Sequence, residues 1–526
     1  LLPATTTLKA RVLSPGGEWS PLQEAQYLVP VALPAFQPTG SADWTADANW
    51  TSTPLPYPHG PNAAALLNAP TTADRNVNIR APVTVGSVFV KQEDSAYRNR
   101  IRDQGIGNTL TFASTNGPAL LTVEGTGTGY VEFEVAAGVV LASDLKLTVN
   151  NTAGSAEHGA LRLRAGWSGP GGLIKEGDGV ASLTGEGNAY TGPTVINQGV
   201  LQVTEPASPS ASSGLAVTPG GQLRLISAST EGVPRVYGFG GTLSLDSTGR
   251  SGVLPASGQG VAGGLRFQPE TDNSVAVVTN ALLVEGLSGI HVEGSRNTLE
   301  LTGPLSGFSG LIKSGGGRLV LSGTSDGYLQ PVTVSNGTLD VRGPLASSVT
   351  LEPAATLSGT ASAGPLLGTG TVALDRTILS APIALGLNYA FSFSTRGSPA
   401  YADPAASGNG VLRLFSAYAA GAWPLIDIYL DVADLAEGDR LRGGLFVELP
   451  GNLATFLDAA TVRFFTPDPS GTHKLAGRAY SPYLGLLPLA ATAVPERADF
   501  ADRTRHGWVI EVRAGAAPLL YAAWAD

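Results

Sequence analysis

Short stretches in which apolar and polar residues alternate recur along most of this chain, and each is preceded by Gly or Asn. Such alternation is typical of a strand with one buried face, and the Gly or Asn in front supplies the tight turn that leads into the strand. The clearest copies follow the pattern Gly/Asn-x-Leu-x-Leu/Val at residues 199–203, 221–225, 241–245, 297–301, 317–321 and 337–341. Their first leucines are 20 or 22 residues apart in the two groups Leu201, Leu223, Leu243 and Leu299, Leu319, Leu339.

This spacing predicts a right-handed parallel β-helix. About twenty residues are too few for a strand–helix–strand crossover but enough for one coil of two or three short strands. Successive coils then stack, and equivalent leucines form a continuous interior column. Residues 105–415 leave room for roughly 15 coils and a rod of about 70 Å. A β-sandwich also has strands at short intervals, but the repeat keeps residue identity as well as spacing, which favours the solenoid.

Two longer windows, residues 172–203 and 310–341, align without a gap at an offset of 138 residues. Thirteen of their 32 positions are identical, beginning with Gly-Leu-Ile-Lys. We expect the glycines at corners, the leucines in the interior, and Lys175 and Lys313 on the outer face beside a turn. The repeat positions that we single out are Gly172, Lys175, Leu183, Gly199, Leu201, Val203, Gly310, Lys313, Leu321, Gly337, Leu339 and Val341.

Both windows resemble the passenger-associated transport repeat, also called the autotransporter-associated β-strand repeat, of bacterial surface proteins. The first window departs from that pattern at Ala181, and the second has Leu329-Gln330 in place of a Thr-Gly corner. Residues 42–50 also resemble the Trp-x-x-x-x-Asn-Trp opening of such proteins. The resemblance implies a right-handed β-helical protein that is secreted or displayed on a bacterial surface.

The two ends differ from the repeats, so the chain divides into four predicted regions. Residues 1–38 contain an alternating hairpin and a Pro-rich linker, and the hairpin resembles the closing strands of small immunoglobulin-like modules. Residues 39–104 are predicted to form an N-terminal cap and the first coils. Residues 105–374 are the β-helix core, and residues 375–526 are a β-rich cap over the open edge of the last coil.

Both termini also predict self-association. A two-stranded hairpin is marginally stable by itself, and the tail at residues 518–524 is apolar. We expect a terminal strand of one copy to complete a sheet of the next copy. The residues predicted to take part are Leu8, Val12, Trp19, Tyr27, Leu520 and Trp524.

Composition narrows the possible functions. The 526 residues include 68 Gly, 37 Pro, no Cys and no Met, which excludes disulfides, thiolate metal sites and a cysteine nucleophile. Only 14% of residues are charged, the net charge is −10 and there is no basic run, so no nucleic-acid partner is predicted. No apolar stretch is long enough for a transmembrane helix. The absence of Met suggests that the chain is processed or is part of a longer product.

Candidate chemistry is sparse. The densest acidic set predicts a solvated edge of the cap, with a calcium site as the alternative; it consists of Asp427, Asp431, Asp434, Glu437 and Asp439. Arg162 and Arg164 project outward from one strand beside Trp167, either as a solvated face or as a site for an acidic sugar. The histidines show no metal-ligand spacing; they are His59, His158, His291, His473 and His506. No cofactor is predicted.

The sequence therefore predicts a non-catalytic extracellular structural protein, a rod-like subunit of a surface fibre, filament or surface layer. Stacked coils give a long, stiff object that needs little charge and no cofactor. One alternative is a surface adhesin that binds glycans or host proteins. Another is a β-helical polysaccharide lyase or hydrolase, which would need paired carboxylates or a calcium cluster with a basic residue.

Overall fold

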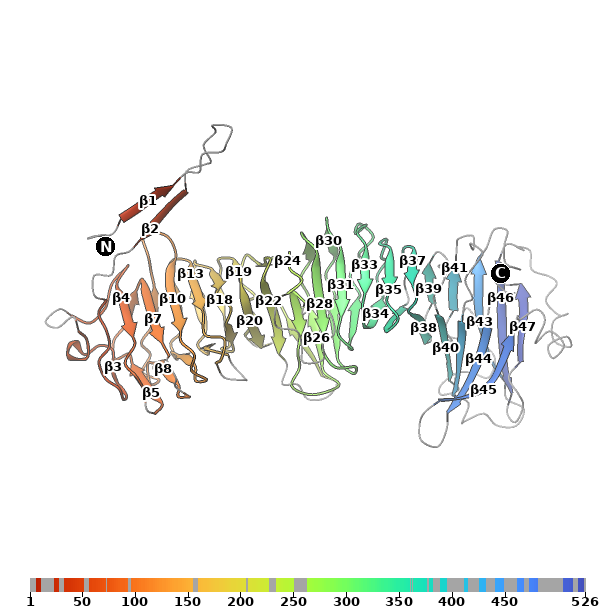
Figure 1. Cartoon of the computed structure of the whole chain (residues 1–526), viewed down its shortest axis with the longest axis horizontal. Helices are drawn as coiled ribbons and strands as arrows, with labels where there is room; N and C mark the ends of the chain where they lie inside the picture. Colours follow the sequence, from red (N-terminus) through yellow and green to blue (C-terminus); the bar gives the residue numbers. More distant parts are fainter. Residues whose placement is uncertain are drawn as a thin grey trace.

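The computed structural model describes residues 33–373 with their side chains, apart from 52–55, 72, 93–95, 155–158, 205–206, 227–232, 250–262, 360 and 362. Outside this range, and at the end of β38 (Thr371–Asp375), it describes only the backbone of strands. Figure 1 shows the strands stacked side by side along one long axis. Near the N-terminal end of the described range lies a short 3-10 turn, η1 (Asp47–Asn49).

The longest sheet has fourteen parallel strands and follows most of the rod. At about 4.8 Å between strands it spans about 60 Å. In spatial order its strands are β3 (Ala42–Asp43), β5 (Arg75–Asn78), β8 (Asn99–Arg102), β11 (Val131–Glu134), β14 (Leu161–Leu163), β17 (Val180–Leu183), β20 (Gly199–Thr204), β22 (Gly221–Ile226), β25 (Leu265–Phe267), β28 (Ser288–Val292), β31 (Leu311–Ser314), β33 (Val332–Val334), β35 (Val349–Leu351) and β37 (Leu366–Gly368).

A second parallel sheet has ten strands, and the chain enters it just before the fourteen-stranded sheet in most coils. Its strands are β4 (Ala64–Leu67), β7 (Ser87–Lys91), β10 (Ala119–Glu124), β13 (Leu145–Val149), β16 (Leu173–Glu176), β19 (Thr194–Ile196), β21 (Gly214–Val217), β24 (Thr242–Leu245), β27 (Leu282–Val284) and β30 (Leu305–Gly307).

The third position in the coil is taken first by a five-stranded sheet and then by an eleven-stranded one. The five strands are β6 (Val83–Val85), β9 (Leu110–Phe112), β12 (Val139–Leu141), β15 (Trp167–Gly169) and β18 (Ala189–Tyr190). The eleven are β23 (Pro234–Tyr237), β26 (Val275–Val278), β29 (Thr298–Leu301), β32 (Arg318–Leu321), β34 (Gly337–Val341), β36 (Ala355–Gly359), β38, β40 (Asn388–Ser394), β42 (Leu425–Asp431), β44 (Thr461–Pro467) and β45 (His473–Tyr480). The predicted all-β, parallel β-helical fold is confirmed.

The interior column follows the predicted leucine spacing in two places but not throughout. Leu201 lies opposite Leu223 in neighbouring strands, and Leu319 lies between Leu299 and Leu339. The prediction that Leu243 continues the column of Leu223 is wrong, because Leu223 pairs with Leu265 and Leu243 belongs to the ten-stranded sheet. The coil that joins β22 to β25 is about twice the usual length, so the 20-residue spacing there links two different sheets.

Aromatic side chains pack at the N-terminal end of the stack, beside β3 and η1. Trp50 contacts Phe36 and Trp44 edge to face, with 5.2 and 4.9 Å between ring centroids. The indole Nε1 of Trp50 donates to the Trp44 carbonyl at 2.7 Å, and that of Trp44 to the Pro58 carbonyl at 3.0 Å. All three rings are buried, so the Trp-x-x-x-x-Asn-Trp segment covers the first coil with apolar surface while its polar N–H groups remain satisfied.

At the other end parallel pairing gives way to antiparallel pairing. β45 pairs antiparallel with β44, and a second five-stranded sheet ends in two antiparallel pairs. Its strands are β39 (Ile378–Ala381), β41 (Val411–Leu414), β43 (Arg440–Glu448), β46 (Arg505–Arg513) and β47 (Leu519–Trp524). Antiparallel strands therefore pair with the edge strands of the last parallel coils. A cap over the end of a β-helix has to cover the open edge in this way.

The N-terminal hairpin consists of β1 (Thr6–Ala10) and β2 (Gln23–Tyr27), paired antiparallel. Of the residues predicted to take part in assembly, Leu8 and Tyr27 lie on these strands, and Leu520 and Trp524 lie on β47. Val12 and Trp19 are outside the described residues. Within the described part of the chain, no helix has the length and hydrophobicity needed to cross a membrane.

Candidate ligand-binding surface

Arg162 and Arg164 project from the outer side of the fourteen-stranded sheet, as the strand alternation predicts. Their neighbours Leu161 and Leu163 are fully buried, whereas the Arg162 side chain is 21% and the Arg164 side chain 47% exposed. The predicted neighbour Trp167 is not part of this surface. It is buried in the interior, where its ring stacks on Phe112 at 6.1 Å between centroids.

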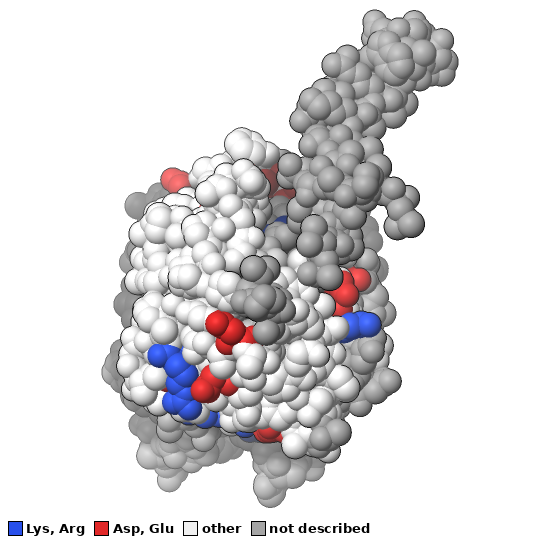
Figure 2. All heavy atoms as spheres, turned by 90° about the vertical axis from the view of Figure 1, so that its left-hand side faces the viewer, with Lys and Arg blue, Asp and Glu red and all other residues white. Residues whose placement is uncertain are grey.

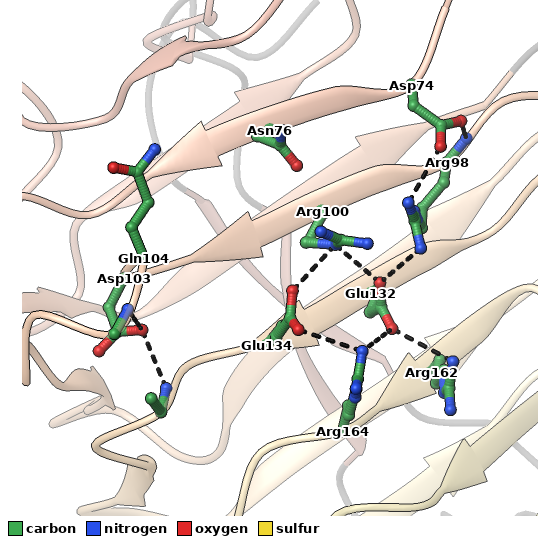
Figure 3. A network of polar contacts seen from close by, with 12 residues as sticks. Asp74, Asn76, Arg98, Arg100, Asp103, Gln104, Glu132, Glu134, Arg162 and Arg164 are labelled. Atoms are coloured by element: carbon green, nitrogen blue, oxygen red, sulfur yellow. Dashed lines mark hydrogen bonds and ion pairs between the residues drawn. The ribbon is translucent and has the colours of Figure 1, made fainter.

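The two arginines meet a buried carboxylate one coil away. Register places Glu132 of β11 between Arg100 of β8 and Arg162 of β14, and Figure 3 shows it at the centre of the arginines. Glu132 is fully buried, and the guanidinium nitrogens around it lie 2.9 to 3.7 Å from its oxygens. Its four partners are Arg98, Arg100, Arg162 and Arg164.

Glu134 and Asp74 extend this network on both sides. Glu134 pairs with Arg100 at 3.0 Å and with Arg164 at 3.1 Å, and Asp74 pairs with Arg98 at 3.1 Å. We call these residues the arginine–glutamate cluster: Asp74, Arg98, Arg100, Glu132, Glu134, Arg162 and Arg164. Several charges that share partners form a stronger unit than isolated surface pairs, and the fully buried carboxylate of Glu132 is compensated from four directions.

The surroundings of Arg98 favour its charged form. Burial lowers the pKa of Arg98, but a hydrogen bond with Tyr130 and the carboxylates of Glu132 and Asp74 outweigh it, so the pKa of Arg98 is raised overall. Figure 2 looks onto the N-terminal end of the rod, and most of its described surface is uncharged.

The cluster carries four arginines and three carboxylates, and Arg102 at its edge adds a fifth positive charge. Arg102 lies opposite Glu134 in register, its side chain makes no ion pair among the described residues, and its Nε is buried without a hydrogen-bond partner. With Arg102, five guanidiniums face three carboxylates. An excess of planar, multiply donating cations on a flat surface is suited to binding anionic groups.

The repeat lysines contradict their predicted position. Lys175 and Lys313 do not lie on the outer face: both are buried, with 1% and 0% exposure. The Nζ of Lys175 donates to the carbonyls of Glu176 and Gly177, each at 2.7 Å, and of Gln198 at 3.1 Å. The ammonium therefore joins the corner of its own coil to the corner of the next.

Lys313 makes the same contacts in the second repeat. Its Nζ donates to the carbonyls of Ser314, Gly315 and Asn336 at 2.9, 2.7 and 2.9 Å. Burial lowers the pKa of Lys313 to about 7. Its aliphatic stem occupies an interior position between Ile290 and Val334 of the neighbouring coils, so the side chain packs along apolar surface and bends its charged end toward the corner.

The glycines and tyrosines that are identical in the two repeats also have structural roles within or between neighbouring coils. Gly199 and Gly337 have φ of 70° and 72°, and an added Cβ would come within 2.3 and 2.4 Å of a carbonyl oxygen of the preceding corner. The Tyr190 hydroxyl bonds Thr194 at 2.7 Å, and that of Tyr328 donates to the Ser309 carbonyl at 2.6 Å. Burial raises the pKa of both tyrosines, so both hydroxyls remain protonated and neutral.

Equivalent strands of the two repeats lie in different sheets. In the first repeat the Leu-Ile-Lys strand is β16 of the ten-stranded sheet and leads into β17 of the fourteen-stranded one. In the second it is β31 of the fourteen-stranded sheet and leads into β32 of the eleven-stranded one. The repeated unit is thus a corner with its two flanking strands, and the second copy is shifted by one side of the coil.

The remaining candidate residues do not form a site that the structure describes. Asp427 and Asp431 lie on the backbone of β42, and Asp434, Glu437 and Asp439 fall outside the described residues. His291 is buried, with Nδ1 3.0 Å from the Ser314 hydroxyl. Among the residues with described side chains, no three His, Asp or Glu converge as metal ligands would.

The comparison with known protein families matches the same two repeats. The family model of the passenger-associated-transport-repeat matches residues 173–203 and 311–341. The chain carries two copies of this repeat. Both matches begin at the buried-lysine strand and end in the next coil, so each match spans that corner and the equivalent corner stacked on it, with their flanking strands.

One similar protein is the adhesin BmaC autotransporter of Brucella suis biovar 1 (strain 1330). It is 27% identical over 204 residues, which is 39% of this chain and 4% of that adhesin. This chain therefore aligns with a small part of a much longer protein. No solved structure matches the chain.

Proposed function

We propose that the chain is a non-catalytic, rod-shaped part of a bacterial surface adhesin, which holds binding surfaces on a stack of parallel coils. The similarity to an adhesin over 204 residues supports this role more directly than it supports a structural fibre. The observation that carries the proposal is the fourteen-stranded sheet, because it offers a long, flat outer face in which side chains of successive coils lie in register.

Expression on a cell surface tests this function. The full chain, fused to a surface anchor on a non-adherent bacterium, should increase attachment to host cells or to immobilised surface glycans. The same anchor displaying an unrelated β-helix of similar length is the control. Equal attachment by the two strains would contradict the adhesin role.

A structural subunit is the second candidate, and one surface feature favours it. Leu287, Phe308 and Leu329 are 53%, 80% and 70% exposed and precede β28, β31 and β33, which are neighbours in the fourteen-stranded sheet. Three exposed apolar side chains on successive coils form a ridge suited to lateral contact between rods. Filaments of the purified chain in electron micrographs, lost in a Phe308→Ser, Leu329→Ser variant, would support this candidate over adhesion.

A further inference from the structure

We propose that the outer face of β8, β11 and β14, built around the arginine–glutamate cluster and Arg102, binds a linear acidic polysaccharide. This inference rests on the proposed adhesin function and assigns the chemical class of its ligand. The face combines a surplus of guanidinium groups, a flat sheet surface and the partly exposed carboxylate of Glu134.

The strand register sets the spacing of the cationic groups. Arg100 and Arg102 lie on β8, and Arg162 and Arg164 lie on the outer side at β14, with β11 between them. The two arginine rows are therefore two strand spacings apart, about 10 Å, and arginines within a row are about 7 Å apart. The carboxylates of Glu132 and Glu134 already bridge the two rows from within. The donors that remain are therefore spread along the rows, where a polymer with charged groups at intervals can reach several of them.

The hydrogen-bond inventory leaves donors for such a ligand. Each guanidinium has five N–H donors, and each carboxylate accepts about four hydrogen bonds, so five arginines exceed the capacity of Asp74, Glu132 and Glu134 by about twofold. The Arg164 and Arg98 side chains are 47% and 27% exposed. The carboxylate of Glu132 is covered and serves to hold the arginines in place.

The glutamates also indicate which polyanion fits. Glu134 is 30% exposed between the arginine rows, so it repels a dense row of phosphates but can accept hydrogen bonds from sugar hydroxyls. The chain as a whole carries a net charge of −10, which disfavours nucleic acid. Alternating guanidinium donors and carboxylate acceptors match a polymer in which hydroxyls separate the anionic groups.

Binding of defined polysaccharides to the full 526-residue chain tests the proposal. Polygalacturonate and dextran sulfate serve as carboxylate and sulfate probes, and uncharged dextran serves as the neutral probe. We expect the wild-type chain to bind at least one acidic probe, more weakly as salt is raised, and not to bind dextran. Binding of dextran alone, or of none of the three, would overturn the proposal.

Paired variants assign the binding to this face. The Arg102→Gln, Arg164→Gln variant should bind about tenfold more weakly or worse. Arg318→Gln, Arg342→Gln is the matched control, because both of those side chains are 46% exposed around the carboxylate of Asp340. The control removes the same charge elsewhere and should change binding less than twofold. Equal losses in both variants would show that only net charge matters and would refute the assigned face.

A third variant protects the test against loss of folding. Glu134→Gln adds one net positive charge to the same face and should strengthen binding of the acidic probe about two- to threefold; weaker or unchanged binding contradicts the proposal. The cell-attachment assay separates the polysaccharide assignment from the adhesin function, with cells that display either the wild-type chain or the Arg102→Gln, Arg164→Gln variant. If the wild-type chain binds no acidic probe, and cells that display either chain still attach, the adhesin function stands and the polysaccharide assignment fails.

Discussion

Replacing Lys313 by Met should weaken the coil junction around the second repeat. Met keeps the apolar stem of the side chain but removes the ammonium that donates to the carbonyls of Ser314, Gly315 and Asn336. A buried acceptor that loses its donor costs about 1–3 kcal/mol, and three are affected. Removing a buried charge offsets part of this by several kcal/mol, so we expect a net loss of about 2–4 kcal/mol.

Because a solenoid opens locally, the assay should report on the corner itself. Hydrogen exchange measured by mass spectrometry on peptides from residues 310–341 is suitable, and a loss of 2–4 kcal/mol corresponds to roughly 30- to 1,000-fold faster exchange through local opening. Lys146→Met is the control, because the Lys146 side chain is 40% exposed and lies 3.8 Å from Glu176. If Lys313→Met accelerates exchange no more than Lys146→Met, the structural role of the buried ammonium is refuted.

The contribution of Lys313 to the stability of the folded chain should rise with pH. The pKa of Lys313 is lowered from its model-peptide value of 10.5 to about 7 in the folded chain, so between these values the unfolded chain binds more protons. Stability from this residue therefore rises with pH in that window, by up to about 1.4 kcal/mol per pH unit. The difference between the wild-type chain and Lys313→Met should grow from pH 7 to pH 9, and a constant difference would contradict the lowered pKa.

Three further substitutions test other parts of the rod. Asp103 accepts backbone N–H groups of Gly105, Gly107 and Ala136; although burial opposes it, these bonds lower the pKa of Asp103. Asp103→Asn should lower the free energy of unfolding in denaturant by about 1–3 kcal/mol at pH 7, and the difference should shrink as the pH falls below about 4. Gly337→Ala should destabilise its coil by more than 1 kcal/mol, whereas Gly327→Ala, where an added Cβ meets nothing within 4 Å, should be nearly neutral in the same melt. Trp50→Ala should lower the free energy of unfolding by about 3–5 kcal/mol and expose residues 35–70 to limited proteolysis. Unchanged cleavage would argue against the role of this ring in covering the first coil.

The fold could be predicted because its unit is short and repeats along the chain. The alternation of apolar and polar residues predicts the strands, and the Gly or Asn in front of each strand predicts the corners. The regular spacing of these strands predicts that the coils stack. The prediction failed at Leu243 because coil length is not constant: the coil from β22 to β25 returns to the same sheet only at Leu265. A period alone cannot show which side of a coil a strand occupies.

The lysine error has a different cause. Lys175 is two residues after the buried Leu173, so strict alternation placed it in the interior, and the expectation of an exposed charge overrode that signal. What makes burial possible is the carbonyl of Gln198 in the next coil, together with two carbonyls of its own corner. No pattern in the chain marks those acceptors, because every residue has a carbonyl and only the corner geometry directs three of them to one point.

Only part of the arginine–glutamate cluster could be predicted from the sequence. Arg162 and Arg164 stood out as an outward pair, but Glu132 lies 30 residues before Arg162, and the coils in this part of the rod are longer than the 20-residue repeat. Once coil lengths are known, Arg100, Glu132 and Arg162 fall into one row. Register between coils, rather than composition, determines which charges meet.

The shift of the second repeat by one side of the coil has a consequence for any attempt to engineer this rod. A peptide epitope inserted into equivalent corners of the two repeats would be displayed toward two different directions around the long axis. An antibody against that epitope would therefore approach the same molecule from two sides, although the two insertion points are indistinguishable in a sequence alignment of the repeats.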